Sequence, residues 1–186
     1  MGKFEIRIVM VMIQENQKVK IMEQEQERLK FCISRYDHYF DSVNNKSNVY
    51  LTLSVFIFGG MLGLYSNLLE KTNYHFWVNV LMLVIMGIGL IAMLITILAS
   101  RPYLTKETDS LLFFQSVSNM GEAEFSKRSQ VFSKEQEMND LRLQTLQLAN
   151  GLKSKFAKLH LVATLVAIQF TLFIPLTVTI LNNLKN

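Results

Sequence analysis

Charged residues are absent from three long stretches of this 186-residue chain: Ser47–Leu69, Thr72–Ser100 and Leu159–Leu184. These stretches contain 23, 29 and 26 residues, and a helix needs about 20 apolar residues to cross the hydrocarbon of a bilayer. A soluble domain would distribute its charges along amphipathic elements. The absence therefore excludes an ordinary soluble protein, and we expect an all-α integral membrane protein with three transmembrane helices and a cytoplasmic helical layer.

The chain is also poor in cysteine and lacks the features of a signal peptide. Cys32 is the single cysteine, which excludes an intrachain disulfide and suits soluble parts that face a reducing cytoplasm. The apolar run Ile8–Ile13 is only six residues long and is followed by Gln14 rather than by a small-residue cleavage site. We therefore expect no cleaved secretory signal peptide at this end.

Recognisable catalytic motifs are absent as well. The sequence has no glycine-rich phosphate loop, no serine nucleophile elbow and no paired His/Glu metal helix. His38, His75 and His160 are far apart and lie near predicted membrane boundaries. We expect a protein that is not an enzyme and that uses no metal or other cofactor.

The distribution of lysine and arginine predicts the orientation of the chain. Residues 1–46 carry eight of them, residues 101–158 carry nine, and two lie elsewhere. Because basic residues near a span are retained in the cytoplasm, we expect the N-terminus inside and the C-terminus in the periplasm or outside the cell. We therefore expect any ligand to be a cytoplasmic one, because almost all of the water-soluble part of the chain lies on the cytoplasmic side.

Four segments follow from this assignment. Residues 1–46 form a cytoplasmic arm and helix, and residues 47–100 form a hairpin of two transmembrane helices. Residues 101–158 form a cytoplasmic sensing region, and residues 159–184 form the third transmembrane helix. Within the arm, Phe4–Ile13 alternates in polarity, which suits a short strand or the first turns of an amphipathic helix.

The sensing region is expected to be helical with one interruption. Thr108 or Asp109 is a candidate N-cap, residues 119–121 interrupt the pattern, and a helix restarts at Glu122. Residues then recur at an alternating spacing of three and four for three heptads, which suggests a coiled-coil seam, although the polar residues Thr145 and Lys155 weaken it. Its members are Met138, Leu141, Thr145, Leu148, Leu152, Lys155 and Leu159. No proline occurs between Pro102 and Pro175, so this helix is expected to continue into the third span.

Polar residues within the third span suggest a pathway. Thr164 and Thr171 fall within about 20° of each other on a helical projection, and Gln169 lies between them in sequence. We consider these three residues as pore-lining. The alternative for the threonines is that their hydroxyls bond to carbonyls of their own helix. Three spans do not enclose a pore alone, so a channel requires a homo-oligomer.

Basic and aromatic residues of the cytoplasmic segments suit a nucleotide-like ligand, because cations bind phosphate and rings stack on bases. The alternative is that the cations follow the positive-inside rule and the rings pack a helical core. The candidates are Arg35, Lys46, Arg101, Lys127, Arg128, Lys153 and Lys155, with Tyr36, Tyr39, Phe40, Phe113 and Phe114.

Several short motifs resemble the Pycsar transmembrane effectors, in the same order relative to the spans. Residues 36–53 resemble the start of that family's first span, with Asn44, Lys46 and Ser47 in the places of an acidic or amide residue, a lysine and a small residue. Arg101-Pro102 and Leu112-Phe113-Phe114 resemble two further signatures. Residues 122–125, Asp140-Leu141, Gln147 and Lys155-Phe156 resemble its later part, so the similarity covers about residues 36–182.

The resemblance implies a bacterial antiphage effector of the inner membrane. In such systems a partner cyclase makes cyclic UMP or cyclic CMP, and the membrane protein responds by impairing the membrane and arresting growth. This chain departs from the family in Asn44, where relatives carry Asp, and in the arm of residues 1–35, which has no placed match. A short oligonucleotide made by a nucleotidyltransferase is therefore a second candidate signal, and it would either open or close the channel.

Together these observations lead to a hypothesis and a rival. The hypothesis is a homo-oligomeric channel, with a tetramer as one arrangement considered, whose cytoplasmic helices bind a nucleotide-derived signal. Asn44 joins the candidate ligand residues through the resemblance. The rival is a non-conducting membrane scaffold that recruits a cytoplasmic partner.

Overall fold

The computed structural model describes residues 3–69, 76–101 and 110–185, and all regular structure in these ranges is helical. The helices are α1 (Lys3–Leu69), α2 (Phe76–Ser100), α3 (Phe114–Ser118), α4 (Glu122–Val131) and α5 (Lys134–Lys185). Three of them, α1, α2 and α5, are long and apolar enough to cross a membrane. The predicted all-α membrane fold is confirmed.

The short strand considered for residues 4–13 is wrong, because these residues form the first turns of α1. Isoleucine and valine favour strands only where a neighbouring strand completes the hydrogen bonds. No strand occurs within the described ranges, whereas a helix satisfies its backbone within itself. The amphipathic-helix alternative is the correct one.

Helices α1 and α5 each extend well beyond the length of a span. Gly59, Gly60 and Gly63 lie inside α1 without interrupting it, and Pro175 lies inside α5. In hydrocarbon an unpaired backbone group has no water to bind, which keeps a helix intact across residues that would weaken it in solution. The prediction of one helix running without interruption from the sensing region into the third span is confirmed.

The second span is predicted from about Trp77 to Ala99, and α2 agrees with this within one residue at each end. Pro102, which is expected to break the helix, lies outside the described residues, but α2 ends two residues before it. The end of α2 agrees with the rule that a proline disfavours helical backbone angles in the residue before it.

The sensing region is less helical than predicted. The interruption at residues 119–121 and the restart at Glu122 are confirmed, and the candidate caps Thr108 and Asp109 lie outside the described residues. Residues 110–113, however, precede the short helix α3 and are not helical. The Ser110 hydroxyl accepts hydrogen bonds from the amides of Leu112 and Phe113, both at 3.1 Å, and this local pairing replaces a helical turn.

A second interruption, at Phe132-Ser133, is not among the predictions. The Ser133 hydroxyl accepts a hydrogen bond from the Gln136 amide at 3.2 Å, and the Gln136 side chain accepts one from the Ser133 amide at 2.9 Å. This reciprocal pairing is a capping box, which satisfies orphan amides at a helix start. It separates α4 from α5.

The chain divides into two compact units. Unit 1 comprises Met1–Tyr39 and Leu104–Gly151, and unit 2 comprises Phe40–Tyr103 and Leu152–Asn186. Within unit 1, Leu29 of α1 packs against Met138 and Leu141 of α5. Gln26 hydrogen-bonds Glu137 at 2.6 Å, and a two-oxygen ion pair joins Arg142 to Glu25 at 2.7 and 2.8 Å.

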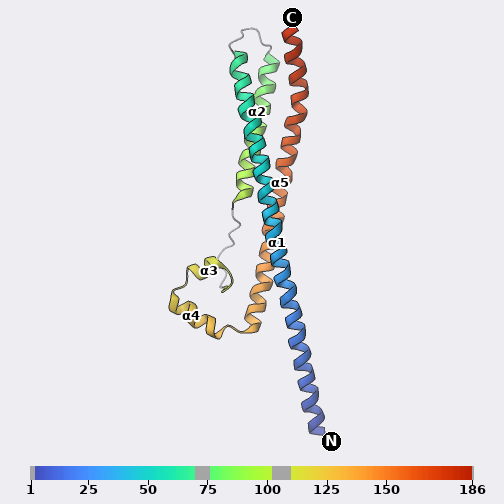
Figure 1. Cartoon of the computed structure of the whole chain (residues 1–186), viewed down its shortest axis with the longest axis vertical. Coiled ribbons are helices and arrows are strands. Elements are labelled where there is room, and N and C mark those ends of the chain that lie inside the picture. The colour runs from blue at the N-terminus through green and yellow to red at the C-terminus, as the bar shows by residue number, and fades with distance from the viewer. Residues whose placement is uncertain (1–2, 70–75, 102–109, 186) are drawn as a thin grey trace. The chain divides into compact units, whose positions relative to one another are not determined.

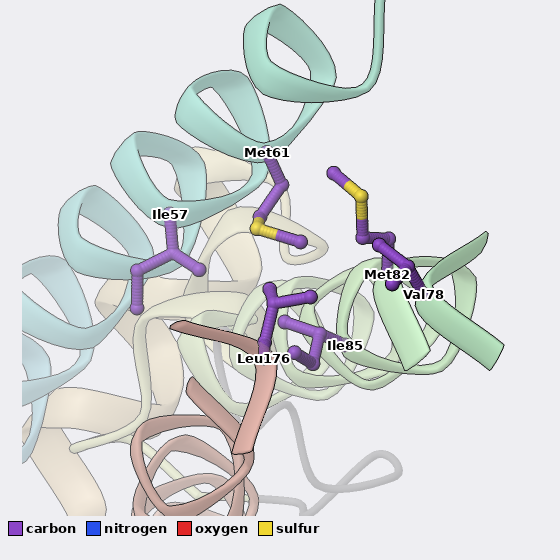
Figure 2. Close-up of a cluster of buried hydrophobic side chains, with 6 residues drawn as sticks. All are labelled: Ile57, Met61, Val78, Met82, Ile85 and Leu176. Carbon is purple, nitrogen blue, oxygen red and sulfur yellow. The ribbon is translucent and has the colours of Figure 1, made fainter. Parts of the chain in front are cut away.

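Unit 2 is a three-helix bundle in which α1, α2 and α5 lie side by side (Figure 1). Figure 2 shows one apolar cluster, formed by Ile57 and Met61 of α1, Val78, Met82 and Ile85 of α2, and Leu176 of α5. A second cluster, Ala92, Val162 and Val166 with Tyr50 and Leu53 packed against it, uses earlier residues of α1 and α5 but later residues of α2. Helices α1 and α5 therefore run in the same direction, and α2 runs opposite to both.

The predicted seam of α5 faces inward. Met138, Leu141, Leu152, Lys155 and Leu159 are buried, and Thr145 and Leu148 are half-buried. The residues at this spacing thus share the inward side of the helix. The spacing also places one lysine, Lys155, among apolar neighbours.

Candidate anion site

Lys155 is the one charged residue among the buried residues of the described chain, with 6% of its surface exposed. It belongs to unit 2, and its ammonium donates a long hydrogen bond of 3.4 Å to Asn44 Oδ1 of α1. The same nitrogen lies 5.8 Å from the centre of the Phe40 ring, within the range of a cation–π contact. No carboxylate among the described residues pairs with it.

The electrostatics of Lys155 follow from this environment. Burial lowers the pKa of Lys155 below its usual value, and the nearby positive charge of Lys158 lowers it further. An amide oxygen and a ring face compensate a buried ammonium only in part. The position therefore favours binding of an anion that would bring the missing negative charge.

Ser47 is a second polar residue on the same face of α1. Its side chain is fully buried and its hydroxyl has no hydrogen-bond partner among the described residues. Phe40, Asn44 and Ser47 are spaced by four and three residues, so they lie on one face of α1, the face that contacts Lys155. In the sequence Ser47 served only as the small residue of a motif. The signal that would have identified it is this helical spacing from Asn44.

The other predicted cations are not brought together with Lys155. Lys46, Arg101 and Lys153 belong to unit 2 and are exposed. Arg35 belongs to unit 1, where it is exposed and donates a hydrogen bond of 2.8 Å to the Tyr39 hydroxyl while lying 5.6 Å from that ring. Of the predicted ligand residues in unit 2, the structure joins Asn44 and Lys155 directly.

Unit 1 holds the remaining candidates. Lys127 is exposed, and Arg128 pairs with Glu124 one turn earlier on α4 at 2.8 Å. The rings of Phe113 and Phe114 lie 5.2 Å apart and tilted. This segment is fixed by Ser110, whose hydroxyl donates a hydrogen bond of 2.7 Å to Asp140 of α5, a link that sequence reasoning missed.

The three candidate pore residues separate by burial. Thr164 and Thr171 are exposed, and their hydroxyls donate to the carbonyls of His160 and Ala167, both at 3.0 Å. Gln169 is fully buried, and its amide nitrogen donates to the Ile85 carbonyl of α2 at 3.0 Å. The threonines thus make the bonds to their own helix that the alternative describes, and their exposed face is also free for contact with another subunit or an aqueous path.

The described residues contain no group of three or more histidine, cysteine, aspartate or glutamate side chains arranged to hold a metal ion. The chemistry of the Lys155 site is that of binding: one cation, one amide and one ring face. Such a set has the chemical groups to bind an anionic group attached to a flat ring system.

Comparison with known proteins gives one match. The family model described as the Pycsar effector protein domain matches residues 28–182. This range begins eight residues before residue 36, where the motif resemblance starts, and so includes part of the N-terminal arm. No curated protein and no solved structure matches the chain.

Proposed function

Since this chain belongs to the Pycsar effector protein family and is accordingly an antiphage membrane effector, we propose that it is a homo-oligomeric channel gated by a nucleotide-derived signal. Members of this family are non-enzymatic and respond to a nucleotide signal from a partner cyclase. Together with the three apolar helices, the family indicates the inner membrane. The proposed orientation has the N-terminus in the cytoplasm and the C-terminus on the opposite side.

The observation that carries the proposal is the buried ammonium of Lys155. This ammonium of α5 contacts the Asn44 amide oxygen and the Phe40 ring of α1, and no carboxylate among the described residues pairs with it. A phosphate would supply the negative charge that this environment lacks, and charge-assisted hydrogen bonds to phosphate are among the strong ones. The base of the nucleotide would stack on an aromatic ring such as Phe40.

Exposed cations would extend this site toward a larger ligand. In the proposal they attract the phosphate group and set the length of ligand that binds, from a cyclic UMP- or CMP-like mononucleotide to a short oligonucleotide. The supporting residues of unit 2 are Lys46, Arg101 and Lys153. Arg35, Lys127, Arg128, Phe113 and Phe114 belong to unit 1 and are candidates for ligand contacts within that unit.

Helix α5 offers a route from this site to the membrane. It is helical without interruption from Lys134 to Lys185, and Lys155 lies nine residues before Thr164 and sixteen before Thr171. In the proposal, Thr164 and Thr171 line an ion path between subunits after α5 rotates. Gln169 lies about 140° from Thr164 around the helix, so it would line the path in place of the threonines and not together with them. A change from about 1% to 99% open requires about 5.5 kcal/mol of differential binding, which several identical sites would share.

The test compares Lys155→Ala with Lys153→Ala, an exposed neighbour of equal charge. The full-length protein is placed in lipid vesicles, and ion flux is measured after addition of cyclic UMP, cyclic CMP or short oligonucleotides. We expect Lys155→Ala to weaken the response by at least about tenfold, the effect of losing one charge-assisted hydrogen bond, and Lys153→Ala to retain most of it. Lys46→Ala and Arg101→Ala are also expected to weaken it.

Equal responses of the wild type and Lys155→Ala would place the ligand elsewhere. The rival function, a non-conducting scaffold, predicts no current at all. Single-channel recording in a planar bilayer distinguishes the two, with each signal added and then removed, because a gated channel must respond to both steps.

A further inference from the structure

A polar layer separates the two apolar clusters of unit 2. The cluster of Figure 2 uses Ile57 of α1 and Ile85 of α2, and the other uses Tyr50 and Ala92. Between them each helix contributes one buried small or polar residue. These are Ser54 of α1, Gly89 of α2 and Gln169 of α5, and all three are buried.

Gly89 provides the space that the Gln169 amide occupies. A Cβ atom at position 89 would lie 2.6 Å from Gln169 Nε2 and 3.6 Å from its Cδ. The first distance is too short for a Cβ atom and a nitrogen that are not bonded to each other, and the second is an ordinary contact. Any side chain at position 89 would therefore displace the amide group and cost its hydrogen bond to the Ile85 carbonyl, although the rest of the glutamine side chain would still fit.

The layer also contains two polar atoms without partners. Ser54 Oγ and Gln169 Oε1 are buried and form no hydrogen bond within the described residues. An unpaired polar atom is expensive where hydrocarbon replaces water. The arrangement therefore combines one favourable bond, from Gln169 to Ile85, with two unfavourable orphan atoms, so its net stability is small.

Gln169 and the two threonines occupy opposite sides of α5. Five residues separate Thr164 from Gln169, which is about 140° on a helix with 3.6 residues per turn, and the burial of the three residues agrees with this separation. As long as the amide is bound to α2, the rotation of α5 about its own axis is fixed, and Thr164 and Thr171 remain on the outer side.

We propose that Ser54, Gly89 and Gln169 form a polar lock that fixes the rotation of α5 and holds the channel in its resting state. The claim that the lock holds the resting state rests on the proposed function. The claim that the lock fixes the packing of α5 rests on the geometry alone. Gln169 and Gly89 are positioning residues in this proposal. The low net stability of the lock makes it releasable by the free energy of ligand binding.

The test uses Gly89→Ala with Gly87→Ala as its matched control. Both replace a glycine of α2 and raise helix propensity equally, but a Cβ atom at position 87 would meet nothing within 4 Å. In vesicles without any signal, we expect Gly89→Ala to raise the ion leak about tenfold, the change in equilibrium that corresponds to about 1.4 kcal/mol. Gly87→Ala should leave the leak at the wild-type level.

A double-mutant cycle with Gln169→Leu identifies the amide as the cause. Leucine keeps carbon at the Cδ position but lacks the terminal nitrogen. We therefore expect Gly89→Ala to have no further effect on the leak in the Gln169→Leu background, a large departure from additivity. An equal effect of Gly89→Ala in both backgrounds would overturn the lock.

A packing measurement separates the two parts of the proposal. Thermal unfolding of the full chain in detergent should show a lower midpoint for Gly89→Ala than for Gly87→Ala, and the difference should vanish in the Gln169→Leu background.

The outcomes distinguish the two parts. If the midpoints differ as expected and the wild type conducts with ligand, but Gly89→Ala does not change the signal-free leak, the lock is structural and its gating role is wrong. If the wild type never conducts, the proposed function fails and the packing part is judged by the unfolding data. Equal midpoints overturn the packing part.

Discussion

Units 1 and 2 join the same two helices, α1 and α5, by different chemistry. In unit 1 the contacts include an ion pair between Arg142 and Glu25 and a bond from Gln26 to Glu137. In unit 2 the same pair packs through apolar clusters, and the long hydrogen bond from Lys155 to Asn44 is a polar contact between them. The difference agrees with the solvent expected around each unit. Ion pairs between helices are compatible with water, whereas helices in lipid are held together by packing and a few hydrogen bonds.

The largest expected effect comes from shortening one leucine in each unit. Leu141 is 4% exposed in unit 1 and Leu176 is 2% exposed in unit 2. In water, Leu141→Ala should cost about 2–5 kcal/mol of stability because it loses both transfer free energy and packing. In lipid the separated helices stay in an apolar solvent, so Leu176→Ala should cost less, since only packing is lost.

Hydrogen exchange of the full chain in vesicles measures both effects in one experiment, because it reports local opening free energies. Exposed leucines of the same helix, Leu146→Ala for unit 1 and Leu181→Ala for unit 2, serve as controls. Equal losses for Leu141→Ala and Leu176→Ala would show that the two units share one kind of environment.

The membrane helices were predictable from the sequence because the absence of charge over 20 residues is a local signal. The facing of α5 also follows from local spacing, and that spacing alone puts Lys155 on the buried side. The break at Ser133 could have been predicted too, since Ser133 and Gln136 have the spacing of a capping box.

Other features depend on contacts between distant parts of the chain. The link from Ser110 to Asp140 spans 30 residues, and the bond from Gln169 to Ile85 spans 84. Thr164, Gln169 and Thr171 form one group in the sequence because all are polar and close together. Which of them is buried follows the same local spacing: steps of three and four residues from Leu159 lead through Val162 and Val166 to Gln169 and miss both threonines. The partner of Gln169, the Ile85 carbonyl of α2, depends on helix packing, and sequence periodicity does not contain that information.

An intermediate effect is expected from the pH dependence of Lys155. Because the pKa of Lys155 is lowered in the folded protein, the unfolded state binds more protons between that lowered value and the usual 10.5, and stability rises with pH in this window. Below the window the ammonium is charged in both states and its burial cost is complete. Lys155→Met should therefore stabilise the ligand-free protein at neutral pH, because it removes the buried charge.

The stability difference between Lys155→Met and wild type should shrink as the pH rises through the lowered pKa toward 10.5. Thermal unfolding of the full chain at several pH values measures it, with Lys153→Met, an exposed lysine, as the control. A difference that grows with pH would contradict the assigned direction. Saturating anionic ligand should reverse the sign at neutral pH, because it supplies the missing counter-charge.

The smallest effect is expected from the ion pair of unit 1. The hydrogen bond from Arg142 lowers the pKa of Glu25, so the stabilisation is present above the usual glutamate value of 4.5 and is lost as the pH falls through the lowered pKa. Both side chains are substantially solvated, and exposed pairs are weak and screened by salt. Glu25→Gln should therefore lower the protection of unit 1 from hydrogen exchange only slightly, and less at high salt, whereas Glu23→Gln, an exposed neighbour, should have no effect. If Glu25→Gln also lowered the protection of unit 2 by an equally small, salt-dependent amount, charge–charge contacts would act in unit 2 as well. The two units would then differ in how deeply their contacts are buried rather than in the solvent around them.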